Sequence, residues 1–243
     1  MAASYEAVRL ALEAQWSRLI DAFAEAAPLA PSRLPGWSVA DLERHIAQTS
    51  ESLGRLAAGP PAAGPVSGFT EWAAALADTN AQLPRGAPPE STPVLAEVMP
   101  TTLEALAAAR PKHPVRQLTG THHLADAALF RLVEAVVHGM DLPDPPGPDR
   151  QAQGIVVRAL AYHLATLAPG RSVELRISPD AAVQLIEGPR HTRGTPPGVV
   201  EIDPTSFLRL ATGRMTWTEA VDSGRLRASG ERTDLSAYLP LLR

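Results

Sequence analysis

Hydrophobic positions in the first half of the chain recur at helical spacing. Val8, Leu12, Trp16 and Leu19 follow one another at steps of three or four residues, which places them on one face of a helix. The pattern predicts a first helix over residues 5–26, with its apolar face buried against other elements.

A second helix is predicted to begin just after Ser38. The Ser38 hydroxyl is suited to cap the helix, and Asp41, three residues on, can answer it as in a capping box. Trp37 and Leu42 flank the cap and make a hydrophobic staple. His45 lies beside Leu42 on the face that is expected to turn inward.

Three further helical patterns follow, over residues 69–83, 93–109 and 123–142, and the segment RPKHPVRQLTG before the last of them reads as irregular. The last helix stops at DLPDPPGPDR, because four prolines in close succession disfavour helical geometry in the residues before them. This proline-rich segment predicts a domain boundary, with one domain over residues 1–146 and a second over residues 147–243.

The pattern changes in the second half of the chain. After one more amphipathic helix over residues 151–167, the segments SVELRIS and AVQLIEG alternate apolar and polar residues as half-buried strands do. Short strands then mix with short helices: GVVEID, PTSFLRLATGR, WTEAVDSG, RLRASG and DLSAYLPLL. This mixture predicts an α+β domain.

Overall charge and hydropathy exclude two classes of partner. A formal net charge of −4 leaves no basic surface for a nucleic-acid backbone. The sequence has no run of about 18 uncharged apolar residues that could span a bilayer, and its first residues predict an amphipathic helix rather than a secretion signal. We therefore expect a cytoplasmic protein with no nucleic-acid or membrane partner.

Cysteine is absent from the sequence, which excludes disulfides, thiolate metal ligands and a cysteine nucleophile. Any thiol chemistry would need a thiol supplied by a cosubstrate. The sequence also lacks a GxSxG motif, a phosphate-binding glycine loop and a dinucleotide fingerprint, so ordinary hydrolases, kinases and dehydrogenases find no support.

The segment FRLVEAVVHGMDL contains a carboxylate among apolar neighbours. Glu134 and His138 lie four residues apart, on one face of the predicted helix, and Arg131 precedes them on that face. An intrahelical hydrogen bond or a solvated ion pair is the ordinary interpretation. Because the flanking positions are apolar, we favour a divalent cation that compensates the buried charge, and the nitrogen and oxygen donors suit zinc. His45, from the second helix, is the candidate third ligand.

The remaining histidines are weaker candidates. His122 and His123, followed by Asp126, form a rival cluster, but we expect them at the frayed start of a helix, in capping or exposed positions. No partner at ligand spacing accompanies the other three, His113, His163 and His191.

Long segments of the chain resemble a known family. LPGWSVADLERHIAQ (residues 34–48) and RLVEAVVHGMDL (residues 131–142) resemble the two signature segments of the mycothiol-dependent maleylpyruvate isomerase family, a branch of the DinB-like metal-binding four-helix bundles. VVEIDPTSFLRLATGRMTWTEAVDSGRLRASGE resembles the C-terminal domain of that family, which is related to sterol-carrier proteins. The resemblance implies an α+β chain of two domains, a DinB-like four-helix bundle followed by a smaller sterol-carrier-like domain.

The resemblance also implies a metal site. In that family the histidine of the first segment and the Glu-x-x-x-His of the second bind a divalent metal, usually zinc, and the matching residues here are His45, Glu134 and His138. Met140 departs from the family pattern, since relatives often have tryptophan there; this changes the lining of the pocket and leaves the ligand set intact.

The family precedent implies that the open metal position receives the thiol of mycothiol, a small thiol of actinobacteria. A bound zinc favours the thiolate near neutral pH. The thiolate can add to an activated double bond, allow rotation and leave, which gives cis–trans isomerisation. If the adduct persists, the same step is S-transfer.

Arg225 and Arg227 are the candidates for binding a substrate carboxylate. They lie two residues apart on the predicted strand RLRASG and so point to one side of the sheet, where they could pair with a carboxylate in a cleft between the domains. A solvated sheet face is the ordinary alternative. The likeness to sterol carriers does not predict lipid transport, because a shared fold does not carry function.

The sequence is therefore consistent with three functions. The leading hypothesis is a zinc-dependent enzyme, a monomer or homodimer, that uses mycothiol to act on a small electrophile as an isomerase or S-transferase. The first alternative is a thiol-independent metal hydrolase. The second is a non-catalytic module that binds a metal for stability and an apolar ligand in its C-terminal domain.

Overall fold

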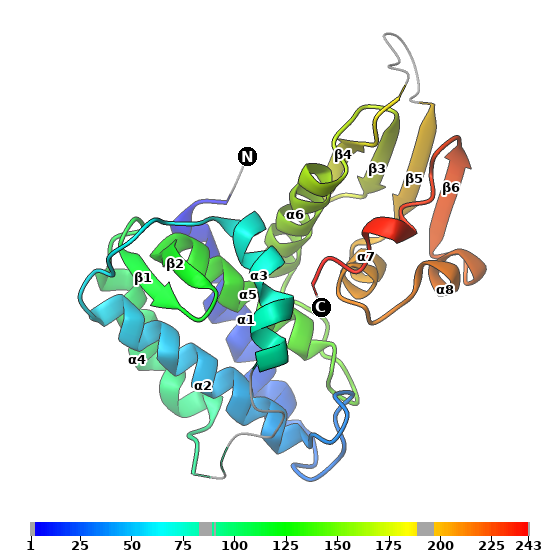
Figure 1. The fold of residues 1–243 in the computed structure, drawn as a ribbon. Coiled ribbons are helices and arrows are strands. Elements are labelled where there is room, and N and C mark those ends of the chain that lie inside the picture. Colours follow the sequence, from blue (N-terminus) through cyan, green and yellow to red (C-terminus); the bar gives the residue numbers. More distant parts are fainter. Residues whose placement is uncertain (1–2, 83–88, 90, 189–196, 243) are drawn as a thin grey trace. The chain divides into compact units, whose positions relative to one another are not determined.

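The chain folds into two compact units in the computed structural model, which describes residues 3–82, 89, 91–188 and 197–242 (Figure 1). Ala3–Trp72 and Asp78–Ala152 make up nearly all of the first unit, and Gln153–Arg243 with Ala73–Ala77 make up nearly all of the second. In the described part of the chain, no helix is long and apolar enough to cross a membrane.

Four helices form the bundle of the first unit. They are α1 (Tyr5–Glu25), α2 (Val39–Ala58), α4 (Leu95–Ala108) and α5 (Leu124–Gly139). Both α1 and α2 contact α4 and α5, so each helix has at least two bundle neighbours. A further helix, α3 (Phe69–Gln82), begins in this unit. The predicted four-helix bundle is confirmed, and the structure places α2 against α5, the two helices that carry the candidate ligands.

The start of α2 follows the prediction in detail. The backbone N–H of Ser38 donates to the Asp41 carboxylate at 2.9 Å, and the Ser38 hydroxyl accepts from the N–H of Asp41 at 3.2 Å. This capping box satisfies two backbone donors that a helix terminus leaves without partners. It also fixes where α2 begins, and therefore which face of the helix carries His45.

Residues 110–120, predicted to be irregular, instead contain most of a β-hairpin. The antiparallel strands β1 (Pro114–Gln117) and β2 (Gly120–His123) pair Val115 with His122. Strands of four residues are too short to show a clear alternation in sequence. The loop after α2 supports the hairpin, because Ala62 donates its N–H to Pro114 and Ser67 donates its N–H to Thr121.

The second unit combines a four-stranded sheet with helices and confirms the α+β prediction. The strands are β3 (Val173–Ile177), β4 (Ala181–Leu185), β5 (Gly198–Ile202) and β6 (Leu226–Gly230). Their order is β4-β3-β5-β6, with β3 and β5 parallel and the other pairs antiparallel. The other elements are α6 (Arg150–Leu167), α7 (Pro204–Ala211), α8 (Trp217–Asp222) and a 3-10 helix (Ser236–Tyr238).

Alternation along the strands separates two faces of this sheet. Val173, Leu175 and Ile177 are buried, whereas Glu174 and Arg176 between them are only partly buried. The apolar face belongs to the core of the unit and the other face is polar, as the pattern in SVELRIS predicts.

Gly54 allows α2 and α4 to approach closely. A Cβ atom at this position would lie 2.8 Å from Thr102 Oγ1 and 3.1 Å from the Thr102 Cα atom. Rotation of the Thr102 side chain could relieve only the first contact, because the second involves the backbone of α4.

We therefore expect Gly54→Ala to lower the free energy of unfolding by about 1–3 kcal/mol, the usual cost of overpacking. Helix propensity alone would favour alanine by about 1 kcal/mol. Gln48→Gly and Gln48→Ala, at an exposed site of α2, measure that propensity without the packing effect. Chemical denaturation of the four proteins checks the prediction, and an alanine variant as stable as the parent would contradict it.

Candidate metal centre

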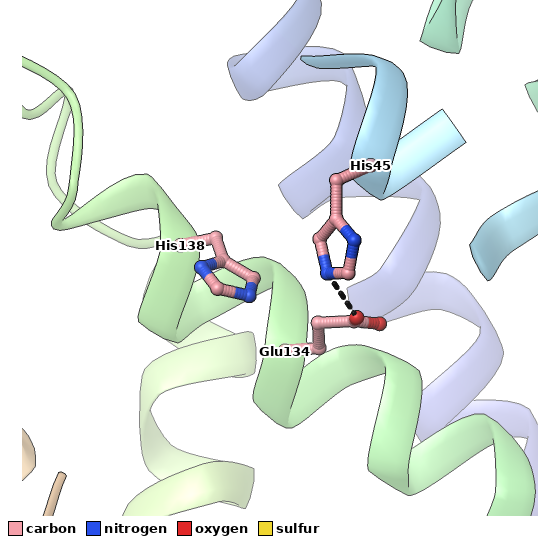
Figure 2. Close-up of side chains that lie close together, drawn as sticks. All are labelled: His45, Glu134 and His138. Atoms are coloured by element: carbon pink, nitrogen blue, oxygen red, sulfur yellow. Dashed lines mark ion pairs between the residues drawn. The ribbon is translucent and has the colours of Figure 1, made fainter. Parts of the chain in front are cut away.

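Three side chains from two helices converge at one point of the bundle. His45 extends from α2, and Glu134 and His138 extend from successive turns of α5 (Figure 2). Each offers one ligand atom, and these atoms lie within 4.8 Å of one another. The structure thus brings together the three residues that were predicted from the sequence. Their spacing follows from the helical repeat of α5 and from the packing of α2 against it.

The site is partly open to solvent. The side chains of His45, Glu134 and His138 are 27%, 17% and 18% exposed, respectively. The apolar neighbours of Glu134 indicated a more deeply buried carboxylate than this. The three side chains are therefore not sealed from solvent.

Two cationic or polar groups hold the carboxylate of Glu134. Arg131 Nη1 lies 2.6 Å from Oε2, and His45 Nε2 lies 3.0 Å from Oε1. Burial tends to raise the pKa of Glu134, but the charge of Arg131, the hydrogen bond from His45 and the charges of both histidines outweigh it and lower the pKa to about 2. The carboxylate is therefore ionised at neutral pH.

His138, in contrast to Glu134, is shifted toward its uncharged form. Burial lowers its pKa, although the hydrogen bond to Asp141 partly opposes that shift. A neutral imidazole and an ionised carboxylate are the protonation states that bind a metal ion. The donor set of two nitrogens and one oxygen therefore fits a divalent cation such as zinc.

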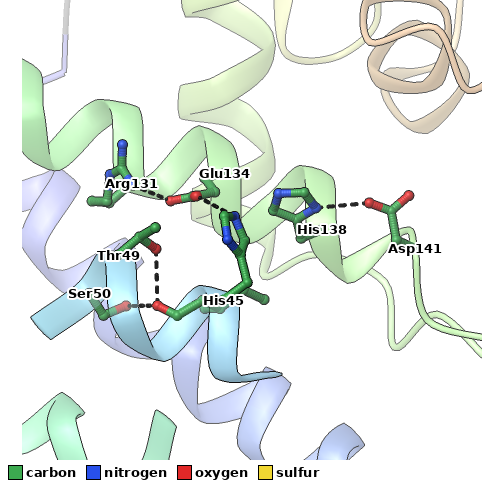
Figure 3. A network of polar contacts seen from close by, with 8 residues as sticks. His45, Thr49, Ser50, Arg131, Glu134, His138 and Asp141 are labelled. Atoms are coloured by element: carbon green, nitrogen blue, oxygen red, sulfur yellow. Dashed lines mark hydrogen bonds and ion pairs between the residues drawn. The ribbon is translucent and has the colours of Figure 1, made fainter. Parts of the chain in front are cut away.

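Polar contacts join the three side chains to their neighbours (Figure 3), and an aromatic ring packs beside them. His138 Nδ1 lies 2.9 Å from Asp141 Oδ2. The ring of Trp37 packs edge-on against His45 with 5.3 Å between centroids. Trp37 also lines a hollow of about 460 Å³ formed by the loop before α2, over Leu29–Ser38. Trp37 thus contacts both this hollow and His45.

Sequence reasoning missed Asp141 altogether and assigned Trp37 only to the helix staple. For Asp141 a signal was present, because it lies three residues after His138, just beyond the end of the same helix. The sequence alone does not show that its carboxylate turns back toward the imidazole.

The rival cluster at residues 122–126 does not form a metal site. His122 lies in β2 and is fully buried, which corrects the expected capping or exposed position. Its Nδ1 is 2.9 Å from the Ser67 carbonyl oxygen and its Nε2 is 3.1 Å from Thr119 Oγ1, so the hairpin and the preceding loop occupy both ring nitrogens. His123 is the N-cap residue of α5, but its side chain makes no capping hydrogen bond.

Two further histidines among the described residues lie outside the candidate centre. His113 lies partly buried just before β1, and His163 is buried in α6. His191 lies outside the described residues.

Arg225 and Arg227 belong to the second unit and are both exposed. Arg225 immediately precedes β6, and Arg227 in β6 pairs in register with Glu201 of β5. Glu201 also accepts a hydrogen bond from Arg176 of β3 at 3.4 Å. The polar face of the sheet thus carries a row of alternating charges, and the role of the two arginines in substrate binding stays a prediction.

Comparison with known proteins finds two family matches. Residues 9–143 match the model of the mycothiol maleylpyruvate isomerase N-terminal domain. Residues 149–241 match that of the bacterial SCP ortholog. No match was found among curated proteins.

Two solved structures share this fold over most of the chain. They are the crystal structures of the mycothiol-dependent maleylpyruvate isomerase and of a histidine-to-alanine mutant of it. Each shows 18% sequence identity and a TM-score of 0.54, and each alignment covers 94% of this chain and 95% of the other.

Replacement of Arg131 tests how the charge of Glu134 is stabilised. In metal-free protein at neutral pH, we expect Arg131→Gln to lower the free energy of unfolding by about 1.5–3 kcal/mol, since a hydrogen bond to a charged group is lost. The folded-state pKa of Glu134 is depressed, so this contribution is present above the unfolded pKa of about 4.3 and is lost as pH falls toward about 2.

Denaturation curves of parent and variant between pH 2 and pH 7 measure that difference. The matched control is Arg9→Gln, which removes an ion pair of the same sequence spacing to the exposed Glu6 and should change stability little. A difference for Arg131→Gln that stays constant over the whole pH range would show that Glu134 is not the group involved.

Proposed function

The chain belongs to the mycothiol maleylpyruvate isomerase family, and from this we propose that it is a metal-dependent enzyme with mycothiol as its thiol cosubstrate. Its substrate is a small electrophile, and the reaction is a cis–trans isomerisation of the maleylpyruvate type or an S-transfer. The observation that carries the proposal is the convergence of His45, Glu134 and His138 on one point.

Zinc is the metal that we propose for this site. Two imidazole nitrogens and one carboxylate oxygen are a common zinc ligand set, and three protein ligands leave a fourth position for an external group. Zinc at this position would lower the pKa of a bound thiol and favour the thiolate near neutral pH. The absence of cysteine from the chain agrees with a nucleophilic sulfur that comes from a cosubstrate.

The protein groups around the site have separate roles in this proposal. Arg131 binds Oε2 of Glu134 and leaves Oε1 on the side of His45. The hollow lined by Leu29–Ser38 provides room beside Trp37 for part of a bound molecule. Arg225 and Arg227 are the proposed partners of a substrate carboxylate.

Other parts of the proposal rest on the sequence. They are the domain boundary between residues 146 and 147, the cytoplasmic location and the state of a monomer or homodimer.

Metal content tests the proposed ligands. We expect about one zinc per chain in the purified protein, and loss of nearly all of it in His45→Ala or Glu134→Ala, because two remaining ligands hold zinc weakly. Glu104→Ala, at an exposed site of α4, removes a carboxylate without touching the site and should retain the metal. Full zinc retention in both ligand variants would exclude this site.

Activity measured with and without mycothiol separates the three functions. We expect zinc-loaded protein to turn over one or more members of a panel of small electrophiles only when mycothiol is added, because the chain has no thiol of its own. Equal turnover without thiol would favour a metal hydrolase. Tightly held zinc with no turnover in either condition would favour a binding module.

Kinetic analysis tests the two arginines. If they bind a substrate carboxylate equally in the ground and transition states, Arg225→Gln and Arg227→Gln should raise KM and leave kcat nearly unchanged. The matched control is Arg176→Gln, which removes the same charge from the same sheet. Arg176 donates a hydrogen bond to Glu174 at 2.7 Å. Unchanged KM in all three variants would indicate a solvated sheet face.

A further inference from the structure

Asp141 occupies a place that disfavours a carboxylate. It follows α5, which ends at Gly139, and its side chain is only 3% exposed. Burial removes the water that would solvate the charge, and the carbonyl groups at the C-terminal end of a helix repel an anion. A carboxylate kept in such a place needs compensating contacts, and one of them is the imidazole of His138.

This contact bears on which ring nitrogen of His138 carries the proton. An ionised carboxylate only accepts hydrogen bonds, so with Asp141 ionised the 2.9 Å contact between its Oδ2 and His138 Nδ1 places the hydrogen on Nδ1. In a neutral imidazole, Nε2 is then left with a free lone pair. Figure 3 shows this second nitrogen turned away from Asp141, on the side of Glu134 and His45.

We propose that Asp141 is a positioning residue that holds His138 in the orientation and tautomer needed to bind the metal. The inference rests on the proposed metal site and adds to it a residue outside the ligand set. Metal-binding histidines generally donate their other N–H to a carboxylate or carbonyl group, and this partner fixes the ring and raises its basicity as a ligand.

The backbone of Asp141 makes a second, separate connection. Its carbonyl oxygen accepts the N–H of Arg33 at 2.7 Å. Arg33 belongs to the loop that carries Trp37, and Trp37 packs against His45. The side chain of Asp141 therefore contacts His138, and its backbone carbonyl binds the loop whose Trp37 packs on His45. A substitution of the side chain tests the first role while the backbone bond to the loop remains available.

Zinc affinity of the full-length chain is the first readout. We expect Asp141→Ala to weaken zinc binding about 10–100-fold, the usual effect of removing such a partner, in competition with a chromophoric chelator. Asp144→Ala, an exposed carboxylate three residues further on, is the matched control and should bind zinc as the parent does. A folded Asp141→Ala protein with the parent affinity would overturn the inference.

The tautomer of His138 in metal-free protein is the second readout, and a general loss of stability would not reproduce it. Proton–nitrogen correlation spectra should show His138 protonated at Nδ1 in the parent and largely at Nε2 in Asp141→Ala, with the signals assigned by their absence in His138→Gln. An Nδ1–H ring that persists in the variant would overturn the inference.

If the Asp141→Ala protein does not fold, Asp141→Asn takes its place, because asparagine keeps the side-chain volume of aspartate. Its amide can both donate and accept, so we expect a mixture of tautomers and weaker zinc binding, and the parent tautomer with the parent affinity would count against the inference. A parent protein that binds no zinc would refute the proposed function and this inference together. Normal zinc binding in the parent and in both Asp141 variants would refute only the inference.

Discussion

The charge of Glu134 is the constraint on which the candidate centre depends. A carboxylate between two packed helices is unfavourable unless nearby groups compensate it. Arg131, one turn earlier in α5, binds one oxygen, and His45 from α2 lies at hydrogen-bond distance from the other. The ion pair within α5 keeps the carboxylate ionised, and the helix packing brings an imidazole to its free oxygen.

The elements around the centre determine how these side chains are directed. The capping box at Ser38 sets the first turn of α2, and the loop before it is joined to the end of α5 through the bond from Arg33 to Asp141. Both helices therefore carry their candidate ligands close to an end that other contacts hold in place. Ligands near fixed helix ends keep their geometry better than ligands on a free loop would.

The sequence predicts those features that local periodicity encodes. The apolar repeats of α1 and α2, the cap at Ser38 and the four-residue spacing of Glu134 and His138 are all local, and the structure agrees with each. The hairpin of β1 and β2 was missed because its short strands depend on the loop that packs along them. The burial of His122 was missed for the same reason, since its partners Ser67 and Thr119 lie outside its own strand.

The composition of the ligand set bears on why the chain would rely on an external thiol. As ligands, two imidazoles and one carboxylate supply a single negative charge, so a divalent cation bound to them would keep a net positive charge. Arg131 adds a further positive charge nearby. Each cysteine ligand would add a negative charge and reduce the attraction for an anionic fourth ligand. A site made of His45, Glu134 and His138 therefore favours an incoming thiolate over a neutral group, and this preference agrees with a chain that has no cysteine of its own.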